Sequence, residues 1–209
     1  MAVADAYSAD AGQASPALPS GASQQPFDTF PLPATGKRVR LRPLRAGDLE
    51  AFHGYRSDHD VSRYQGWLPM SKADAAAFIH SMEIVTGAAI GGWIQLGIAL
   101  EGSDLLVGDV GLFVSEAGDW AEIGISFAKA YQGNGLASEA LELLIALVFG
   151  HTRCQAIRGV ADARNLASRR LVERLGFAPA SEVDAVFRGE SCVEITYVLA
   201  KRTSPGSAS

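Results

Sequence analysis

Three apolar segments in the middle of the chain are separated by short polar connections. They are GWIQLGIAL (92–100), LLVGDVGLFV (106–114, or from Leu105) and WAEIGISF (120–127), joined by EGSD and SEAGD. Connections this short are typical of hairpins, whereas a crossover between parallel strands needs about a dozen residues or more. The middle of the chain is therefore predicted to be a three-stranded antiparallel meander, around which the other elements must fit.

The segments on either side of the meander alternate between strand and helix patterns. KRVRLRPL (37–44) alternates apolar and arginine residues as a half-buried strand does, and Asp48 and Ser71 are expected to begin two helices. After the meander, residues 135–150 carry apolar residues at i, i+4, i+7, i+8 and i+11, the stripe of a core-facing helix. The remaining elements are a strand at 155–162, a helix at 165–177 ending at Gly176, and strands around 182–188 and 190–200.

This order of elements predicts an α/β (α+β) fold. A meander followed by strand–helix–strand implies one mixed, mostly antiparallel sheet of six to seven strands with helices on both faces. The globular pattern covers residues 37–201, the size of a single domain. Residues 1–30 are rich in Ala, Ser, Pro, Gly and Gln and are predicted to be a disordered extension, and residues 202–209 to be a flexible tail.

Composition narrows the classes of function. The sequence has no run of 18 apolar residues and no secretory signal pattern, so neither a membrane-spanning helix nor export is expected. A net charge of −5 argues against nucleic acid as the main partner. Cys154 and Cys192 are isolated in apolar runs, which predicts buried thiols in a reducing cytoplasm, and the scattered histidines indicate no metal site.

The segment AYQGNGLASEAL (130–141) places two glycines at the start of an expected helix. Gly133 and Gly135 permit positive φ and close approach of a ligand, and a helix N-terminus attracts anions. No Lys follows Gly135, which excludes a P-loop. GNGLAS approximates a dinucleotide fingerprint, with Asp162 at the spacing of a ribose-binding acid, but that motif needs a parallel strand context. A phosphate-bearing coenzyme and a plain turn both remain compatible with this loop.

The pattern formed by Gln132, Gly135 and Ala137 (Q-x-x-G-x-A) resembles the coenzyme loop of the GNAT superfamily of acyl-CoA-dependent N-acetyltransferases. The likeness is to the RimJ/RimL-like branch, which contains the ribosomal-protein-alanine acetyltransferases, and it extends from residue 37 to about 200. The segments that carry it are VRLRPLRAGDLEAF, DVSRYQGW, LVGDVGLF, AEIGISFAKAYQGNGLASEAL and ADARNLASRRLVERLGF. It implies the GNAT fold, in which two central parallel strands, here 120–127 and 155–162, splay apart.

The resemblance also implies where acetyl-CoA would bind. In the family the pyrophosphate lies on the glycine loop, and the pantetheine arm pairs with the backbone of the splayed strand. Asn165 matches a polar position of the family's RNxxS segment and is also a plausible N-cap. The coenzyme-binding residues that the resemblance implies are Ile125, Ser126, Phe127, Gln132, Gly133, Asn134, Gly135, Leu136, Ala137 and Asn165.

Two residues are expected to act in catalysis. Glu122 corresponds to the strand carboxylate that serves as base in parts of the family, and the strand period places it on one face with Gly124 and Ser126. Many relatives carry a Tyr as general acid where this chain has Val172. The resemblance therefore implies Ser168 as the residue that protonates the leaving thiolate.

The resemblance thus implies transfer of an acetyl group from acetyl-CoA to a primary amine by direct attack, without a metal. The acceptor would be a protein N-terminus or a small-molecule amine. Neither nucleic acid nor a membrane is expected as a partner, and a homodimer is compatible with such folds. The alternative is a non-catalytic module that binds or senses acyl-CoA on the same fold.

Overall fold

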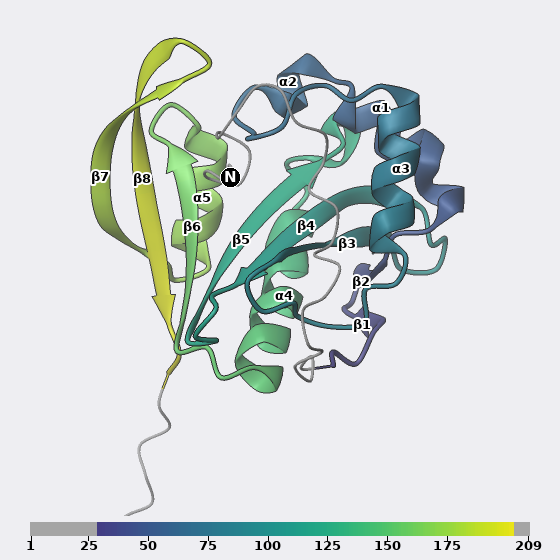
Figure 1. The fold of residues 1–209 in the computed structure, drawn as a ribbon, viewed down its shortest axis with the longest axis horizontal. Coiled ribbons are helices and arrows are strands. Elements are labelled where there is room, and N and C mark those ends of the chain that lie inside the picture. Colours follow the sequence, from purple (N-terminus) through teal and green to yellow (C-terminus); the bar gives the residue numbers. More distant parts are fainter. Residues whose placement is uncertain (1–28, 203–209) are drawn as a thin grey trace, which may run out of the picture.

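The computed structural model describes residues 29–202 and folds them around one sheet (Figure 1). Within that range the sheet has eight strands in the order β1-β2-β3-β4-β5-β6-β8-β7. The strands are β1 (Ala34–Thr35), β2 (Val39–Pro43), β3 (Trp93–Leu100), β4 (Leu106–Val114), β5 (Trp120–Phe127), β6 (Ala156–Asp162), β7 (Ala178–Phe187) and β8 (Glu190–Ala200). The helices are α1 (Leu49–Arg56), α2 (His59–Ser62), α3 (Lys72–Met82), α4 (Leu136–His151) and α5 (Leu166–Arg174).

Strands β3, β4 and β5 form the predicted antiparallel meander. Val110 of β4 pairs with Leu96 of β3 on one side and with Ile125 of β5 on the other. Among the strands of residues 29–202, every neighbouring pair is antiparallel except β5 and β6. The mixed, mostly antiparallel α/β fold is therefore confirmed. The eighth strand is β1, whose two residues are too few to leave a periodic pattern in the sequence.

Strands β5 and β6 form the predicted parallel pair, and they stay together for only part of their length. In the described structure Trp120, Ala121 and Glu122 pair with Ala156, Ile157 and Arg158, and no pairing continues beyond them. The two strands then diverge (Figure 1), which leaves a fork between β5 on one side and β6, with its neighbour β8, on the other.

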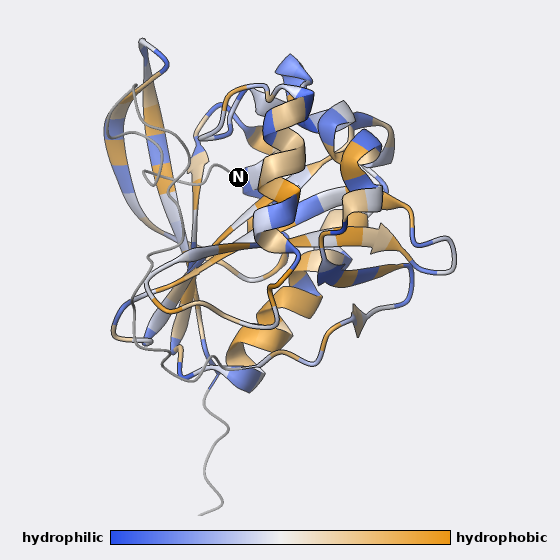
Figure 2. Cartoon of the chain, turned by 45° about the vertical axis from the view of Figure 1, so that its right-hand side comes forward, coloured by the Kyte–Doolittle hydropathy of each residue, from blue (hydrophilic) through white to orange (hydrophobic). Residues whose placement is uncertain are grey.

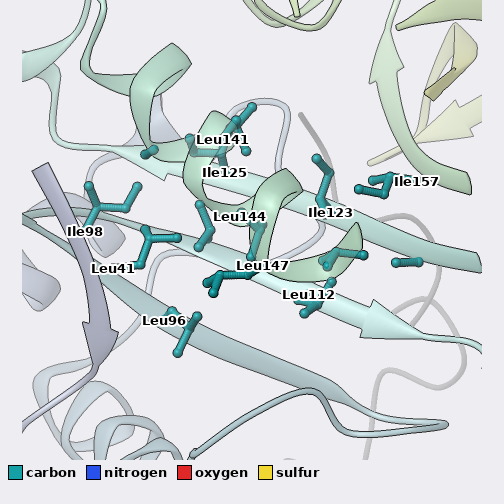
Figure 3. Close-up of a cluster of buried hydrophobic side chains, with 14 of the residues drawn as sticks. Leu41, Leu96, Ile98, Leu112, Ile123, Ile125, Leu141, Leu144, Leu147 and Ile157 are labelled. Atoms are coloured by element: carbon teal, nitrogen blue, oxygen red, sulfur yellow. The ribbon is translucent and has the colours of Figure 1, made fainter. Parts of the chain in front are cut away.

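Helix α4 covers one face of the sheet with an apolar stripe, as its sequence predicts. Figure 2 shows the helix as mostly hydrophobic, and Figure 3 shows Leu141, Leu144 and Leu147 among the side chains of the strands. Burying one leucine side chain contributes about 1.5–3 kcal/mol. The strand residues of this core that the view labels are Leu41, Leu96, Ile98, Leu112, Ile123, Ile125 and Ile157.

The opposite face of the sheet is covered by α1 and α3. Consecutive strand residues point to opposite faces, and while Val110 lies in the core beside α4, Asp109 is bonded to Tyr55 of α1. Phe52 of α1 and Ile79 of α3 belong to a second apolar cluster on this side. The expectation of helices on both faces is confirmed.

The predicted helix ends are largely reproduced. Ser71 caps α3 by accepting a hydrogen bond from the Asp74 amide at 3.1 Å, and Gly176 follows α5 with φ +88°. Two features were not predicted from the sequence. Helix α2 is a single turn capped by Asp58, and β7 begins at Ala178 instead of near residue 182. Both are short or irregular segments with little periodicity.

Residues 29 and 30, the last two of the predicted N-terminal extension, belong to the described structure. Phe30 donates its amide hydrogen to the Thr86 carbonyl at 3.1 Å, and its ring is buried in the core beside α4. Phe30 follows a stretch rich in Ala, Ser and Pro without apolar periodicity, so the sequence gives no indication of this packing. The remainder of that prediction, residues 1–28, and the predicted tail at 203–209 lie outside the described residues.

Two further observations concern the described residues as a whole. None of their helices has both the length and the apolar character needed to cross a membrane. The side chains of Cys154 and Cys192 are both buried, as expected from their apolar surroundings in the sequence.

Candidate functional site

A cavity of about 450 Å³ opens in the fork between β5 and β6. Its walls come from the end of β5, the glycine loop, the first turn of α4, the exposed face of α5 and the segment around α2. The residues expected from the sequence that line it are Ile125, Ser126, Phe127, Gln132, Gly133, Gly135, Ala137, Asn165 and Ser168. The structure therefore brings together residues from three separate segments that the sequence singles out: the end of β5, the glycine loop and the start of α5.

The glycine loop turns the chain into α4 as predicted. Gly133 has φ +79° and Gly135 has φ +76°, both in the left-handed region that residues with a Cβ rarely adopt. Gly135 is the N-cap of α4, so the unpaired amide groups of the first helical turn begin at the cavity. The 16-residue helix thus directs the positive end of its dipole to this site.

Two predicted residues of the loop face elsewhere. Leu136 is buried in the core beside α4. Asn134 accepts a hydrogen bond at its carbonyl oxygen from Arg38 Nη1 at 2.8 Å. Neither is part of the cavity lining, so the loop offers the cavity its glycines, Gln132 and Ala137.

Arg38 supports the loop and was not singled out in the sequence. Its backbone amide donates to Glu139 at 2.6 Å, and its Nε donates to the same carboxylate at 2.9 Å. Although burial alone raises the pKa of Glu139, hydrogen bonds from Arg38 and Val39 hold that pKa below its usual range. A carboxylate in the first turn of α4 would repel an anionic ligand, and Arg38 offsets its charge.

Cationic side chains also reach the cavity from α5. Arg170 and Arg174 are exposed and line it. Asp60, a carboxylate of the lining, forms an ion pair with Lys129. The cavity therefore has a positively charged opening in a chain whose formal net charge is −5.

The backbone of β5 offers two carbonyl groups to the fork. The Ile125 carbonyl accepts a hydrogen bond from Gln65 Nε2 at 3.2 Å, and the Phe127 carbonyl accepts one from Gln132 Nε2 at 2.9 Å. The Ser126 carbonyl points the other way and lies against Gly108 of β4. Alternation along the strand explains this pattern, so Ile125 and Phe127 present backbone groups to a ligand in the fork.

Glu122 lies at the closed end of the fork, in the last residue pair that joins β5 to β6. Its side chain is 3% exposed and accepts a hydrogen bond from Arg158 Nε at 2.6 Å. The Arg158 guanidinium lies over Trp120, 3.6 Å from the ring centre. Glu122 is outside the cavity lining and shares a sheet face with Gly124 and Ser126, as the strand period predicted.

Asn165 and Ser168 meet at the start of α5. The Asn165 side chain accepts a hydrogen bond from the Ser168 amide at 3.2 Å, which makes it the N-cap, and both residues line the cavity. Val172, one turn further on, is fully buried in the core. Asp162 accepts a hydrogen bond from Arg164 at 2.7 Å and is not part of the cavity lining, so the structure does not offer it to a ribose there.

A buried polar network behind the cavity wall was missed by the sequence analysis. Asp109, which pairs with Ser126 across β4 and β5, is completely buried and accepts hydrogen bonds from Tyr55, Arg56 and Gln95. Burial and the adjacent Asp109 charge raise the pKa of Tyr55 well above its ordinary value. The one signal in the sequence is an acidic residue inside the apolar run LLVGDVGLFV.

Comparison with known families identifies the chain as an acetyltransferase. A family model for the acetyltransferase (GNAT) domain matches residues 38–178. The chain therefore belongs to the GNAT family, and the resemblance noted from its glycine loop is confirmed.

Individual proteins show how far the likeness extends. The uncharacterized N-acetyltransferase YnaD of Bacillus subtilis is 25% identical over 142 residues, which cover 68% of this chain and 80% of that protein. A GNAT-family acetyltransferase from Bacillus anthracis matches with a TM-score of 0.71 at 24% identity, covering 80% of this chain and 97% of that one. RimL, a ribosomal alpha-N-protein acetyltransferase solved in complex with coenzyme A, matches at a TM-score of 0.67 and 15% identity, covering 79% and 95%.

Proposed function

We propose that acetyl-CoA binds in the fork cavity and that its acetyl group is transferred to a primary amine by direct attack. One observation carries the proposal: the fork joins an anion-attracting helix terminus to a buried carboxylate at its closed end. The coenzyme A bound to RimL, a structural neighbour with the same fold, supports this choice of ligand.

The phosphates of the coenzyme would bind at the start of α4. Gly133 has open space where a Cβ would lie, and the amides of the first helical turn are free of intrahelical partners. Arg170 and Arg174 add positive charge at the same opening. Charge-assisted hydrogen bonds to phosphate oxygens are roughly twice as strong as neutral ones, so this end of the cavity favours a pyrophosphate.

The pantetheine arm would bind along β5 in the manner of an added strand. Its amide groups can form hydrogen bonds with backbone groups of β5 beyond Glu122, where β6 no longer pairs with the strand. Ile125 and Phe127 have carbonyls that face the fork. The acyl end of the arm would then lie toward the closed end, on the side of Glu122.

The reaction requires a neutral amine and a stabilised oxyanion. The amine nitrogen forms a bond to the acetyl carbonyl carbon, and the C–S bond then breaks to release the coenzyme thiolate. A backbone N–H of β5 facing the fork would stabilise the tetrahedral oxyanion. An alkylammonium has a pKa of about 10.4, so a base must take its proton, and we assign this step to Glu122, directly or through a water chain.

The leaving thiolate also needs a proton. Ser168 lines the cavity at the start of α5, and the position where many relatives have a tyrosine is the buried Val172. We assign Ser168 as the donor of this proton. The protonated thiol of coenzyme A and the N-acetylated acceptor are the two products.

A thiol-release assay tests the proposal. The protein is incubated with acetyl-CoA and a panel of amines that includes peptides beginning with Ala or Ser, and free thiol is followed over time. Release above background, lost in Glu122→Gln and kept in the exposed α4 variant Glu142→Gln, is the expected result. Coenzyme binding without turnover on any acceptor would instead indicate a non-catalytic acyl-CoA-binding module.

A further inference from the structure

We propose that the Gln65 side chain takes a hydrogen-bonding position of the coenzyme in the fork and is displaced when the coenzyme binds. This inference rests on the proposed coenzyme site. It concerns one hydrogen bond, between a side chain of the segment after α2 and the backbone of β5.

Gln65 closes the fork where β5 has lost its parallel partner. The side chain lines the cavity, the residue is 6% exposed, and its Nε2 donates to the Ile125 carbonyl at 3.2 Å. A carboxamide N–H is the same kind of donor as the amide N–H groups of a pantetheine arm. A carbonyl oxygen can accept two hydrogen bonds, but Gln65 reaches the Ile125 carbonyl from the cavity side, where the arm would lie, so the two donors would compete for the same space beside it.

The backbone that carries Gln65 is anchored separately from its side chain. Arg188, in the turn between β7 and β8, donates to the carbonyls of Gln65 and Trp67 at 3.2 and 2.7 Å. The Trp67 ring in turn lies 4.4 Å from the guanidinium of Arg56, which is paired with the buried Asp109. The Gln65 carboxamide can therefore leave the Ile125 carbonyl by rotation of its own side chain, while the segment after α2 stays in place.

The exchange has a measurable cost for coenzyme binding. The bond between Gln65 and Ile125 must break before the arm can take the position of the carboxamide on the cavity side of the carbonyl. A net hydrogen bond of ordinary strength corresponds to about a 2- to 10-fold change in a binding constant. A chain that lacks the Gln65 donor should bind coenzyme A more tightly by this factor, because it has no internal bond to break.

Calorimetric titration with coenzyme A tests the inference. The full chain is compared with Gln65→Met, which keeps the length of the side chain without the donor, and with Gln65→Leu. The matched control is Gln155→Leu, because exposed Gln155 also donates its Nε2 to a backbone carbonyl, that of Arg153 at 2.8 Å, but away from the cavity lining. We expect about 2- to 10-fold tighter binding in both Gln65 variants and unchanged binding in the control.

Unchanged or weaker binding in folded Gln65 variants would overturn the inference and leave the proposed function intact. An unaltered chain that binds no coenzyme A would overturn the proposed function, and the role of Gln65 with it. A second measurement covers the case in which the variants do not fold. In the unaltered chain, the side-chain amide resonances of Gln65 should shift on addition of coenzyme A while those of Gln155 stay fixed, and an unmoved Gln65 signal would contradict the displacement.

Discussion

Arg158 holds Glu122 at the closed end of the fork, with 2.6 Å between Arg158 Nε and Glu122 Oε2. The same guanidinium lies over the Trp120 ring, so the arginine bridges the two parallel strands through a carboxylate and an aromatic face. This arrangement fixes the proposed base beside the point where β5 and β6 separate.

The first prediction concerns Glu122 as the base. Glu122→Gln should lower kcat by about 100-fold or more, because general base catalysis typically contributes 10²–10⁴-fold. The Michaelis constant for acetyl-CoA should change little, since Glu122 is outside the cavity lining. Steady-state kinetics with an accepted amine measure both constants. A variant with unchanged kcat at all amine concentrations would show that another group takes the proton.

The second prediction compares two glycines at the ends of α4. Gly135→Ala forces a side chain into the left-handed region at φ +76° and should destabilise the fold by about 1–2 kcal/mol. Gly150→Ala, near the other end, has open space around the new Cβ and should be stabilising by roughly 0.5–1 kcal/mol. Urea unfolding of both variants measures the difference. If both variants changed the free energy of unfolding equally, the left-handed backbone conformation would not be the reason for a glycine at position 135.

The third prediction uses the pH dependence of the Arg38–Glu139 pair. Burial raises the pKa of Glu139 in the folded chain, but hydrogen bonds from Arg38 and Val39 lower it further than burial raises it. The resulting pKa lies below the ordinary value of 4.5. A carboxyl group whose pKa is lower in the folded than in the unfolded chain stabilises the fold at pH values above its pKa in the unfolded chain. This stabilisation is lost as the pH falls through the pKa of the folded chain. Arg38→Ala should therefore cost up to about 1 kcal/mol at pH 7 and much less well below pH 4.

Urea unfolding of the unaltered chain and Arg38→Ala at both pH values checks this sign. Glu139→Gln should cancel most of the pH dependence of the difference. A loss of stability that is equal at both pH values would assign the effect to packing of the Arg38 side chain. Coenzyme A should also bind more weakly to Arg38→Ala at pH 7, since the Glu139 charge is then less compensated at the start of α4.

The fourth prediction concerns the buried pair of Asp109 and Arg56. Arg56→Met removes one charge and leaves Asp109, which is completely buried, without its ionic partner, so the fold should lose about 3–5 kcal/mol. Replacing both residues together, with Asp109→Leu added, should recover part of this loss. Unfolding free energies of the two single variants and the double variant form the required cycle. A double variant no more stable than Arg56→Met alone would contradict this account.

The sequence predicted those parts of the fold that depend on local pattern. The meander follows from connections of four and five residues, α4 from its leucine stripe, and the left-handed glycines from the loop that precedes it. The class of fold and the general location of the site follow from these elements. Each of them is determined by residues close together in the chain.

Contacts between distant segments could not be read in this way. Arg38 and Glu139 are 101 positions apart, and Gln65 and Ile125 are 60 apart. Their pairing depends on where β2 and the segment after α2 lie relative to β5 and α4. The periodicity of apolar residues gives no information on these positions. The same holds for Asp109. An acidic residue inside an apolar run indicates a buried carboxylate, but the sequence does not show which side chains bind it.

The short pairing of β5 with β6 also has a mechanical meaning. Strands β1 to β5 form one block and strands β6 to β8 another, and in the described sheet three residue pairs join them directly. A pulling force applied across this junction would load those three pairs, whereas the adjacent β4–β5 and β6–β8 ladders have seven pairs each. This junction between the two blocks is also the place where the ligand is proposed to bind, so a ligand that contacts both blocks would reinforce their connection.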